Sequence, residues 1–125
     1  MKMNPKRILV TGGRHYDNVP YIWQTLDKLD TQWKLIRTII EGASDDVTGP
    51  YKGADYWAHQ WALARGRVTV RVHAEWETHG KQAGPIRNKL MIEQKPTLVL
   101  AFQGGKGTAN MKYLARKAKI RVYEV

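Results

Sequence analysis

Five short apolar runs, separated by segments with helical periodicity, constrain the fold of this chain more than any other feature. The runs are rich in Val, Ile and Leu, and they are nearly continuous in hydrophobicity instead of alternating. Strands of a parallel sheet that is covered on both faces have this pattern, because both sides of each strand are buried. The strands are expected at residues 7–11, 35–40, 67–72, 97–102 and 120–125.

Four helices are expected between these strands. The first begins near Val19, with Asp17 or Asn18 placed to cap it, and its apolar residues recur at helical spacing. Gly66 is expected to end the second helix. The second, third and fourth helices are expected at residues 54–65, 85–94 and 108–119.

The alternation of strands and helices predicts an α/β fold, a Rossmann-like three-layer α/β/α sandwich with a five-stranded, mainly parallel sheet. The expected strand order is 3-2-1-4-5. Strands one and four are then central neighbours whose connections leave in opposite directions, and a ligand crevice opens at their carboxyl ends. No repeat, low-complexity segment or linker divides the chain, so we expect a single domain over residues 1–125, long enough to bury its own core.

Composition excludes several classes of chemistry. The chain has no cysteine, so thiol catalysis, thiolate metal sites and disulfides are ruled out. The histidines show no i, i+4 metal-binding pair, and we expect neither a metal nor a cofactor. No apolar run approaches the ~20 residues of a membrane span, and the N-terminus lacks a signal-peptide core, so we expect a cytoplasmic protein without a membrane partner. The histidines are His15, His59, His73 and His79.

The basic charge is concentrated in the C-terminal half. The whole chain has 21 Lys and Arg against 11 Asp and Glu, a formal net charge of +10. Up to Ala62 the basic and acidic residues nearly balance, and almost all of the excess follows. Such a surface attracts phosphates of any kind, from mononucleotides to nucleic acid. A solvated basic face with no specific partner is the alternative.

Two glycine-rich loops are expected to meet at the crevice. Glycine lets a backbone approach a ligand closely, and the start of the following helix offers free N–H groups to an anion, so the pair predicts a phosphate site. Ordinary tight turns are the alternative. Neither loop has a complete dinucleotide-binding or P-loop fingerprint. The residues concerned are Thr11, Gly12, Gly13 and Arg14 after the first strand, and Gly104, Gly105, Lys106, Gly107 and Thr108 after the fourth.

The order of four motifs, VTGGR, then EG with GADYWA, then EWETHGKQAGPIRNKLM, then AFQGGKGTANM, resembles the SLOG superfamily. That superfamily includes the LOG nucleotide phosphoribohydrolases and the DNA-processing protein DprA, and the chain is most similar to its small YspA-type domains. The resemblance extends over about residues 7–125. It implies a Rossmann-like domain that binds a nucleotide or nucleotide derivative and whose GGxGT loop binds the phosphate. It also implies a homo-oligomer.

The LOG catalytic pattern is only partly present. Arg87 and Met91 match its Arg-x-x-x-Met element, but Gln103 replaces a proline and Met111 occupies the catalytic Glu position. Methionine cannot shuttle a proton, so no catalytic residue is assigned, apart from Arg87 if the protein is an enzyme. Carboxylates that could act from other loops are Glu41, Asp55 and Glu75.

The other candidate residues each have a structural alternative. Arg87 is expected at a helix start, where a cation gains nothing from the dipole, so a ligand anion explains it better. Asn88 could bind ribose or base, or tie down a loop, and Asp55 could accept a ribose hydroxyl or cap a helix. Arg14, Lys81 and Lys106 could grip phosphate or only be solvated. Trp57 and Trp76 could stack on a base or fill an interface.

Three functions compete. The leading one is a nucleotide-derivative binding protein, a sensor or sequestering module for ADP-ribose-like, cyclic or monophosphate ligands, because the phosphate loops are present and the catalytic Glu is not. The alternatives are an N-glycosidic hydrolase of the LOG type and a DprA-like DNA-binding protein. The polar loop at residues 42–53 could cover the ligand or be an excursion. The basic residues for DNA are Lys112, Arg116, Lys117, Lys119 and Arg121.

Overall fold

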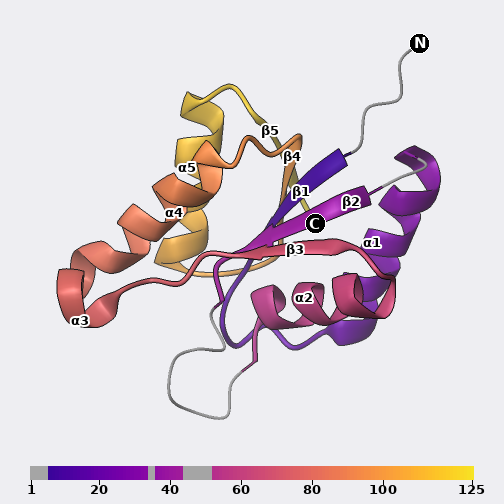
Figure 1. The fold of residues 1–125 in the computed structure, drawn as a ribbon, viewed down its shortest axis with the longest axis horizontal. Coiled ribbons are helices and arrows are strands. Elements are labelled where there is room, and N and C mark those ends of the chain that lie inside the picture. Colours follow the sequence, from indigo (N-terminus) through magenta and orange to yellow (C-terminus); the bar gives the residue numbers. More distant parts are fainter. Residues whose placement is uncertain (1–5, 34–35, 44–51) are drawn as a thin grey trace.

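The computed structural model describes residues 6–33, 36–43 and 52–125 (Figure 1). The helices and strands alternate along the chain, as the apolar runs predict. In order they are β1 (Lys6–Thr11), α1 (Val19–Trp33), β2 (Ile36–Glu41), α2 (Ala54–Ala64), β3 (Val68–Arg71), α3 (Trp76–His79), the 3-10 helix η2 (Gly80–Gln82), α4 (Ala83–Glu93), β4 (Leu98–Ala101), α5 (Lys106–Lys117) and β5 (Arg121–Glu124).

The five strands form one sheet in the order β3-β2-β1-β4-β5, and every neighbouring pair is parallel. This confirms the predicted order 3-2-1-4-5 and the Rossmann-like fold class. β1 lies between β2 and β4, with Leu9 opposite Ile40 on one side and opposite Val99 on the other. The carboxyl ends of β1 and β4 are therefore adjacent, where the chain order changes direction.

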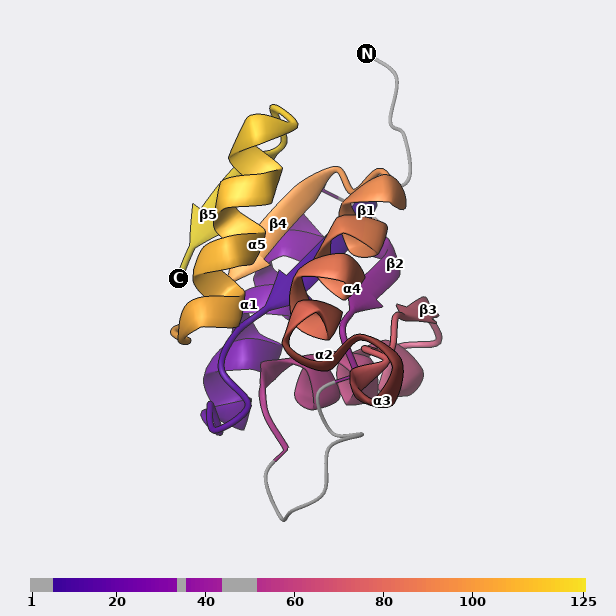
Figure 2. The ribbon, with the colours of Figure 1, turned by 90° about the vertical axis from the view of Figure 1, so that its left-hand side faces the viewer.

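Helices cover both faces of the sheet, which gives three layers (Figures 1 and 2). Ile8 and Val10 of β1 point toward α1 and α2, and pack in one cluster with the fully buried Trp61. Leu9, between them in sequence, points to the other face and packs with Met91 of α4. This alternation along a strand buried on both sides explains why the run is continuously apolar.

Two helices begin earlier than their sequences indicate. α4 starts at Ala83 and α5 at Lys106, each two residues before the predicted first residue. Pro85 thus lies in the first turn of α4, where its missing N–H has no intrahelical partner to lose. The short α3 and η2 were not predicted, because they bury no residue and have no apolar periodicity. The strands differ from the predicted ranges by at most one residue at each end.

The helix ends settle three other predictions. Asn18, and not Asp17, caps α1, since its Oδ1 accepts the Tyr21 N–H at 3.3 Å. Gly66 has a φ of +68° and follows Arg65, the C-cap of α2, as expected of a helix-ending glycine. The cap prediction for Asp55 is wrong: the N-cap of α2 is Gly53, and Asp55 lies within the first turn.

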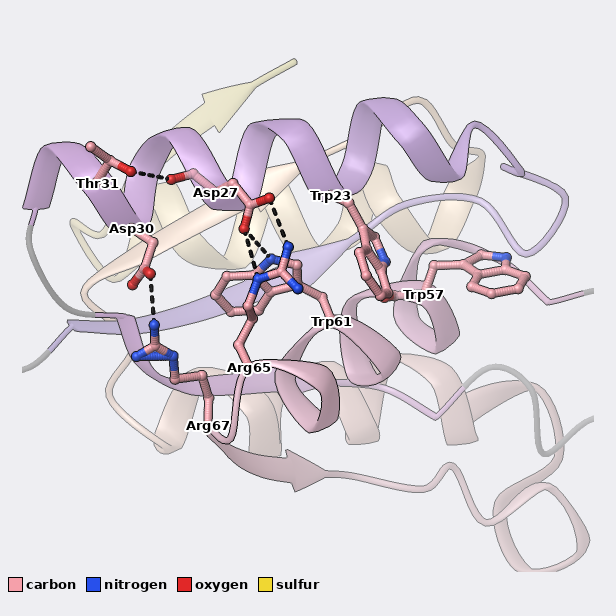
Figure 3. A network of polar contacts seen from close by, with 8 residues as sticks. All are labelled: Trp23, Asp27, Asp30, Thr31, Trp57, Trp61, Arg65 and Arg67. Carbon is pink, nitrogen blue, oxygen red and sulfur yellow. Dashed lines mark hydrogen bonds and ion pairs between the residues drawn. The ribbon is translucent and has the colours of Figure 1, made fainter.

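A set of charged and aromatic side chains joins α1 to α2 (Figure 3). The Asp27 carboxylate accepts the Trp61 Nε1–H at 2.8 Å and two N–H groups of Arg65 at 3.1 and 2.9 Å. Arg67 Nη2 donates to Asp30 at 2.7 Å. We call these five residues the α1–α2 network.

None of the helices in the described part of the chain is long and apolar enough to cross a membrane. Most of the polar loop predicted at residues 42–53 lies outside the described residues, so the two interpretations of that loop stay predictions.

Candidate functional site

The two glycine loops touch each other at the carboxyl ends of β1 and β4. The Gly13 N–H donates to the Gln103 carbonyl at 2.9 Å. A side chain at Gly104 would place a Cβ 2.7 Å from the Gly13 nitrogen and against the Thr108 hydroxyl. Only glycine at position 104 lets the loops approach so closely. The juxtaposition that the strand order predicts is therefore present.

A cavity of about 430 Å³ opens beside this contact. It lies between the first glycine loop, the start of α2, α3 and η2, and the N-terminal parts of α4 and α5. All but one of the predicted site residues line it, and the exception, Gly104, lines a neighbouring hollow with His15 and Asn18. The predicted residues that line the cavity are Thr11, Gly12, Gly13, Arg14, Asp55, Lys81, Arg87, Asn88, Gly105, Lys106, Gly107 and Thr108.

Several lining residues were not predicted as site residues. Gly42 and Asn110 adjoin Arg87 and Asn88, and Trp76 with Gly84 and Pro85 forms an apolar wall. Trp76 and the AGP sequence were visible in the motif that resembles SLOG domains. The part played by Gly42 depends on a contact with Arg87, 45 residues away, for which the sequence has no local signal.

One end of the cavity is formed by the N-terminus of α5. Gly105 is the N-cap residue and makes no side-chain cap, and its carbonyl accepts the first helical bond, from the Ala109 N–H at 3.0 Å. The N–H groups of the first turn have no partner within a helix, and they lie at the positive end of its dipole. Because the cavity is lined by Gly105, Lys106 and Gly107, an anion can approach this backbone.

Arg87 forms a side wall of the cavity and is held at two points. Its Nη1 donates to the Gly42 carbonyl, and its Nε donates to Asn88 Oδ1 at 3.0 Å. A Cβ at position 42 would lie 2.7 Å from Nη1, so the absent side chain of Gly42 makes room for the guanidinium. Burial lowers the pKa of Arg87, the charges of Asp55 and Glu41 raise it, and Arg14 lowers it further.

The position of Arg87 differs from the expectation. It is the fifth residue of α4 and does not lie at the helix start, so the dipole argument for it does not apply. The position of Arg87 is explained instead by the packing of its guanidinium against the end of β2, beside Gly42. Asn88 is buried, and its Nδ2 donates to the Gly107 carbonyl at 3.1 Å and to Asn110 Oδ1 at 2.9 Å. Asn88 therefore ties α4 to the second glycine loop, one of its two predicted roles.

Of the three carboxylates considered as substitutes for the missing Glu, only Asp55 lines the cavity. Its side chain projects from the first turn of α2, where a negative charge is favoured by the helix dipole, and it is only 6% exposed. Glu75 is the exposed N-cap residue of α3 and does not line the cavity. Met111 is fully buried among the apolar side chains under α4 and α5.

Glu41 is a buried carboxylate behind the cavity. It accepts the Ala43 N–H at 2.7 Å and hydrogen bonds from Arg71, and His59 Nδ1 lies 3.6 Å away. Burial raises its pKa to about 7, which outweighs the opposing effect of the Arg71 hydrogen bond. Because Glu41 is fully buried and does not line the cavity, its contacts are those of a structural group.

The cavity is cationic. Arg14, Lys81, Arg87 and Lys106 line it, against Asp55 as the only carboxylate among the lining residues that the structure describes. Within the same described ranges, no ion pair joins Arg14, Lys81 or Lys106 to a carboxylate. The excess positive charge is available to an anionic ligand.

These features define a Rossmann-like α/β protein with a cationic cavity at the topological switch point. The model of the YspA, cpYpsA-related SLOG family (YAcAr) matches residues 6–79, and the chain belongs to this family. The match includes the first glycine loop, and the second lies beyond it. The gene 61 protein of Mycobacterium phage D29 is 34% identical over 123 residues, which cover 94% of each chain. No solved structure matches the chain significantly.

Proposed function

We propose that this protein binds a nucleotide or nucleotide derivative in the cavity between its two glycine loops and acts as a sensor or sequestering module. The cationic lining of the cavity is the observation that carries the proposal. Family membership supports a nucleotide-related role. ADP-ribose-like, cyclic and monophosphate nucleotides are the ligand classes in question, and residues 1–125 act as one binding domain.

The phosphate is proposed to lie at the N-terminus of α5. Backbone N–H groups of the first turn and the ammonium of Lys106 are on that side, and Arg14 adds charge from the first loop. Asn88 and Asn110 hold the second loop against α4, so the donors are positioned before the ligand arrives. Such preorganisation favours binding because little ordering remains to be done.

An N-glycosidic hydrolase is the second candidate, favoured by the presence of Asp55 in the cavity beside Arg87. In such a reaction a water molecule adds across the bond between base and ribose. The carboxylate of Asp55 would take a proton from that water as its oxygen bonds to C1′ of the ribose. The C1′–N bond would break, and the same proton would pass from Asp55 to the nitrogen of the departing base. Loss of base release in Asp55→Asn, with retained nucleotide binding, would assign this role. Retained release would exclude Asp55 as the base.

The structure gives less support to DNA binding. Lys112 and Arg116, two of the basic residues named for it, donate to the Glu124 carboxylate at 2.8 and 2.9 Å, so their charge is partly neutralised. A cytoplasmic location and a homo-oligomeric state also stay predictions.

Calorimetric titration with AMP, cyclic AMP, ADP-ribose and inorganic phosphate tests the leading function. At least one nucleotide is expected to bind with a Kd below about 1 mM. Arg14→Ala removes a cation of the cavity and should weaken that binding about fivefold or more. Lys89→Ala is the matched control, since Lys89 is an exposed cation on α4 outside the cavity lining. Absence of binding at millimolar nucleotide, or an equal loss in both variants, would contradict the proposal.

A further inference from the structure

Trp76 differs from the other tryptophans whose side chains the structure describes. Trp61 is fully buried, and Trp23 and Trp57 pack against the core beneath α1 and α2. Trp76, the first residue of α3, is 44% exposed and lines the cavity. Within the described part of the chain, no other aromatic ring and no cation is stacked on its indole.

The indole is placed against the start of α4. A Cβ added at Gly84 would lie 3.4 Å from Cη2 of Trp76, an ordinary van der Waals distance, so the ring lies directly against this part of the helix. Pro85 continues the same wall. The wall therefore consists of an aromatic face, a glycine and a proline ring, and it has few groups that could hydrogen-bond to the edge of a ligand.

The cavity thus has two chemically different parts. The α5 N-terminus and the cations Arg14 and Lys106 suit an anion, whereas the Trp76 wall suits a flat, apolar group. An exposed indole within a cavity loses contact with water when a planar ring stacks on it, and this burial and the stacking favour binding. A molecule that carries both a phosphate and an aromatic ring matches both parts.

We infer that Trp76 is the platform on which the base of the bound nucleotide stacks. This inference rests on the proposed function and goes further, because it names the residue that distinguishes a nucleotide from a sugar phosphate. Every base has a π face, so recognition through Trp76 tolerates different bases and responds to ring area more than to the pattern of donors and acceptors. Purine nucleotides are then bound more tightly than pyrimidine nucleotides.

Titrations of AMP, GMP, CMP, UMP and ribose 5-phosphate into the full chain test the platform. Wild type should bind the nucleotides about tenfold more tightly than ribose 5-phosphate, the size of one base–aromatic stack. Trp76→Ala should reduce nucleotide affinity to the ribose 5-phosphate level and leave ribose 5-phosphate unchanged. Trp76→Phe, which keeps an aromatic face, should retain most of the preference.

Tyr113→Ala is the matched control, because Tyr113 is an aromatic residue on α5 that is 61% exposed and lies outside the cavity lining. It should leave all affinities unchanged. A second readout is tryptophan fluorescence: AMP should quench wild-type emission, and the quenching should largely disappear in Trp76→Phe although AMP still binds.

The outcomes separate the two proposals. Equal affinity for nucleotides and ribose 5-phosphate in wild type, or an equal loss of both in Trp76→Ala, overturns the platform and leaves the anion site in place. Absence of binding by every probe overturns both. Because Trp76 is exposed and contributes to neither buried cluster, Trp76→Ala is expected to fold like wild type, which circular dichroism can verify.

Discussion

The α1–α2 network and the cavity contain similar charged groups in opposite balance. In the network, two arginines meet two aspartates, and each guanidinium donates to a carboxylate at 2.7–3.1 Å (Figure 3). Among the described residues that line the cavity, four cations meet one carboxylate. Both regions join elements that are distant in sequence. In the network, carboxylates of the protein neutralise the arginines, whereas in the cavity most of the cations have no carboxylate partner among the described residues.

This difference separates a structural site from the proposed binding site in the same molecule. Asp27 also accepts the N–H of the buried Trp61, so the network fixes α2 against α1. In the cavity, Arg14, Lys81 and Lys106 are exposed to solvent, and the half-buried Arg87 donates to an amide oxygen and a backbone carbonyl. These contacts bring no negative charge to the cations. A ligand phosphate would supply the missing negative charge. Variants in the two regions should accordingly affect different quantities.

The largest expected effect is the loss of ligand affinity in Arg87→Ala. The substitution removes a partly desolvated cation from the cavity wall, and nucleotide affinity should fall about 100-fold. Arg87→Lys keeps the charge without the planar fork and should lie between wild type and Arg87→Ala. Calorimetry measures both. Arg65→Ala, in the network, should bind normally, and weakened binding there would remove the distinction between the regions.

Asp27→Ala should have the converse effect. It leaves the buried Trp61 N–H without its acceptor, so the free energy of unfolding should decrease by about 2 kcal/mol, while nucleotide affinity stays constant. Urea unfolding measures the change. Asp27→Asn retains an oxygen acceptor and should lose only about half as much. An unchanged stability in Asp27→Ala would mean that the network contributes little beyond surface contacts.

The raised pKa of Glu41 predicts how the stability of the fold depends on pH. Its pKa is raised from 4.5 to about 7 in the folded protein, so the folded state holds this proton while the unfolded chain releases it. The stabilising contribution is complete below pH 4.5, decreases as the pH rises and is lost above about 7. Between pH 5.5 and 8 the free energy of unfolding of wild type should decrease by about 2 kcal/mol relative to that of Glu41→Gln. Parallel pH profiles of the two proteins would contradict this prediction.

The smallest effect is expected for Lys106→Ala. A cation at the N-terminus of α5 opposes the helix dipole, so the variant should be as stable as wild type or more stable by about 0.5 kcal/mol. Phosphate affinity should nevertheless decrease about fivefold. Thermal unfolding measures the stability and titration measures the phosphate affinity, so together they test whether affinity falls while stability is kept or rises. A loss of stability without a loss of affinity would instead assign Lys106 to the structure.

The sheet could be predicted from the sequence because the central strands β1, β2 and β4 are apolar runs that are mostly buried, and because the more exposed edge strands β3 and β5 are still rich in β-branched or aromatic residues. The meeting of the glycine loops then follows from topology alone. The starts of α4 and α5 could not be predicted from the sequence. Gly84, Pro85 and Gly107 have low helix propensity, and tertiary packing overrides this preference. α3 has no apolar period. For Trp76, in α3, the sequence left two roles possible, base stacking or an interface, and it left the same two for Trp57.

Contacts between distant residues account for the rest. The hydrogen bond from Arg87 to Gly42 and that from Trp61 to Asp27 join residues 45 and 34 positions apart. Neither leaves a periodic or local pattern. Asp55 illustrates the same limit, since an acidic residue near a helix start has the same sequence signature whether it caps the helix or lines a cavity.

The pairing of β1 with β4 has a consequence for how such a protein can change its ligand. Neighbouring strands lie about 4.8 Å apart through backbone hydrogen bonds, so the spacing of the two turns that follow them is set first by the backbone of the sheet. The wall formed by α3 and the start of α4 belongs to a separate part of the chain. If the proposed function holds, substitutions in this wall can change which ligand is preferred, while the backbone pairing of β1 and β4 keeps the proposed phosphate site in place.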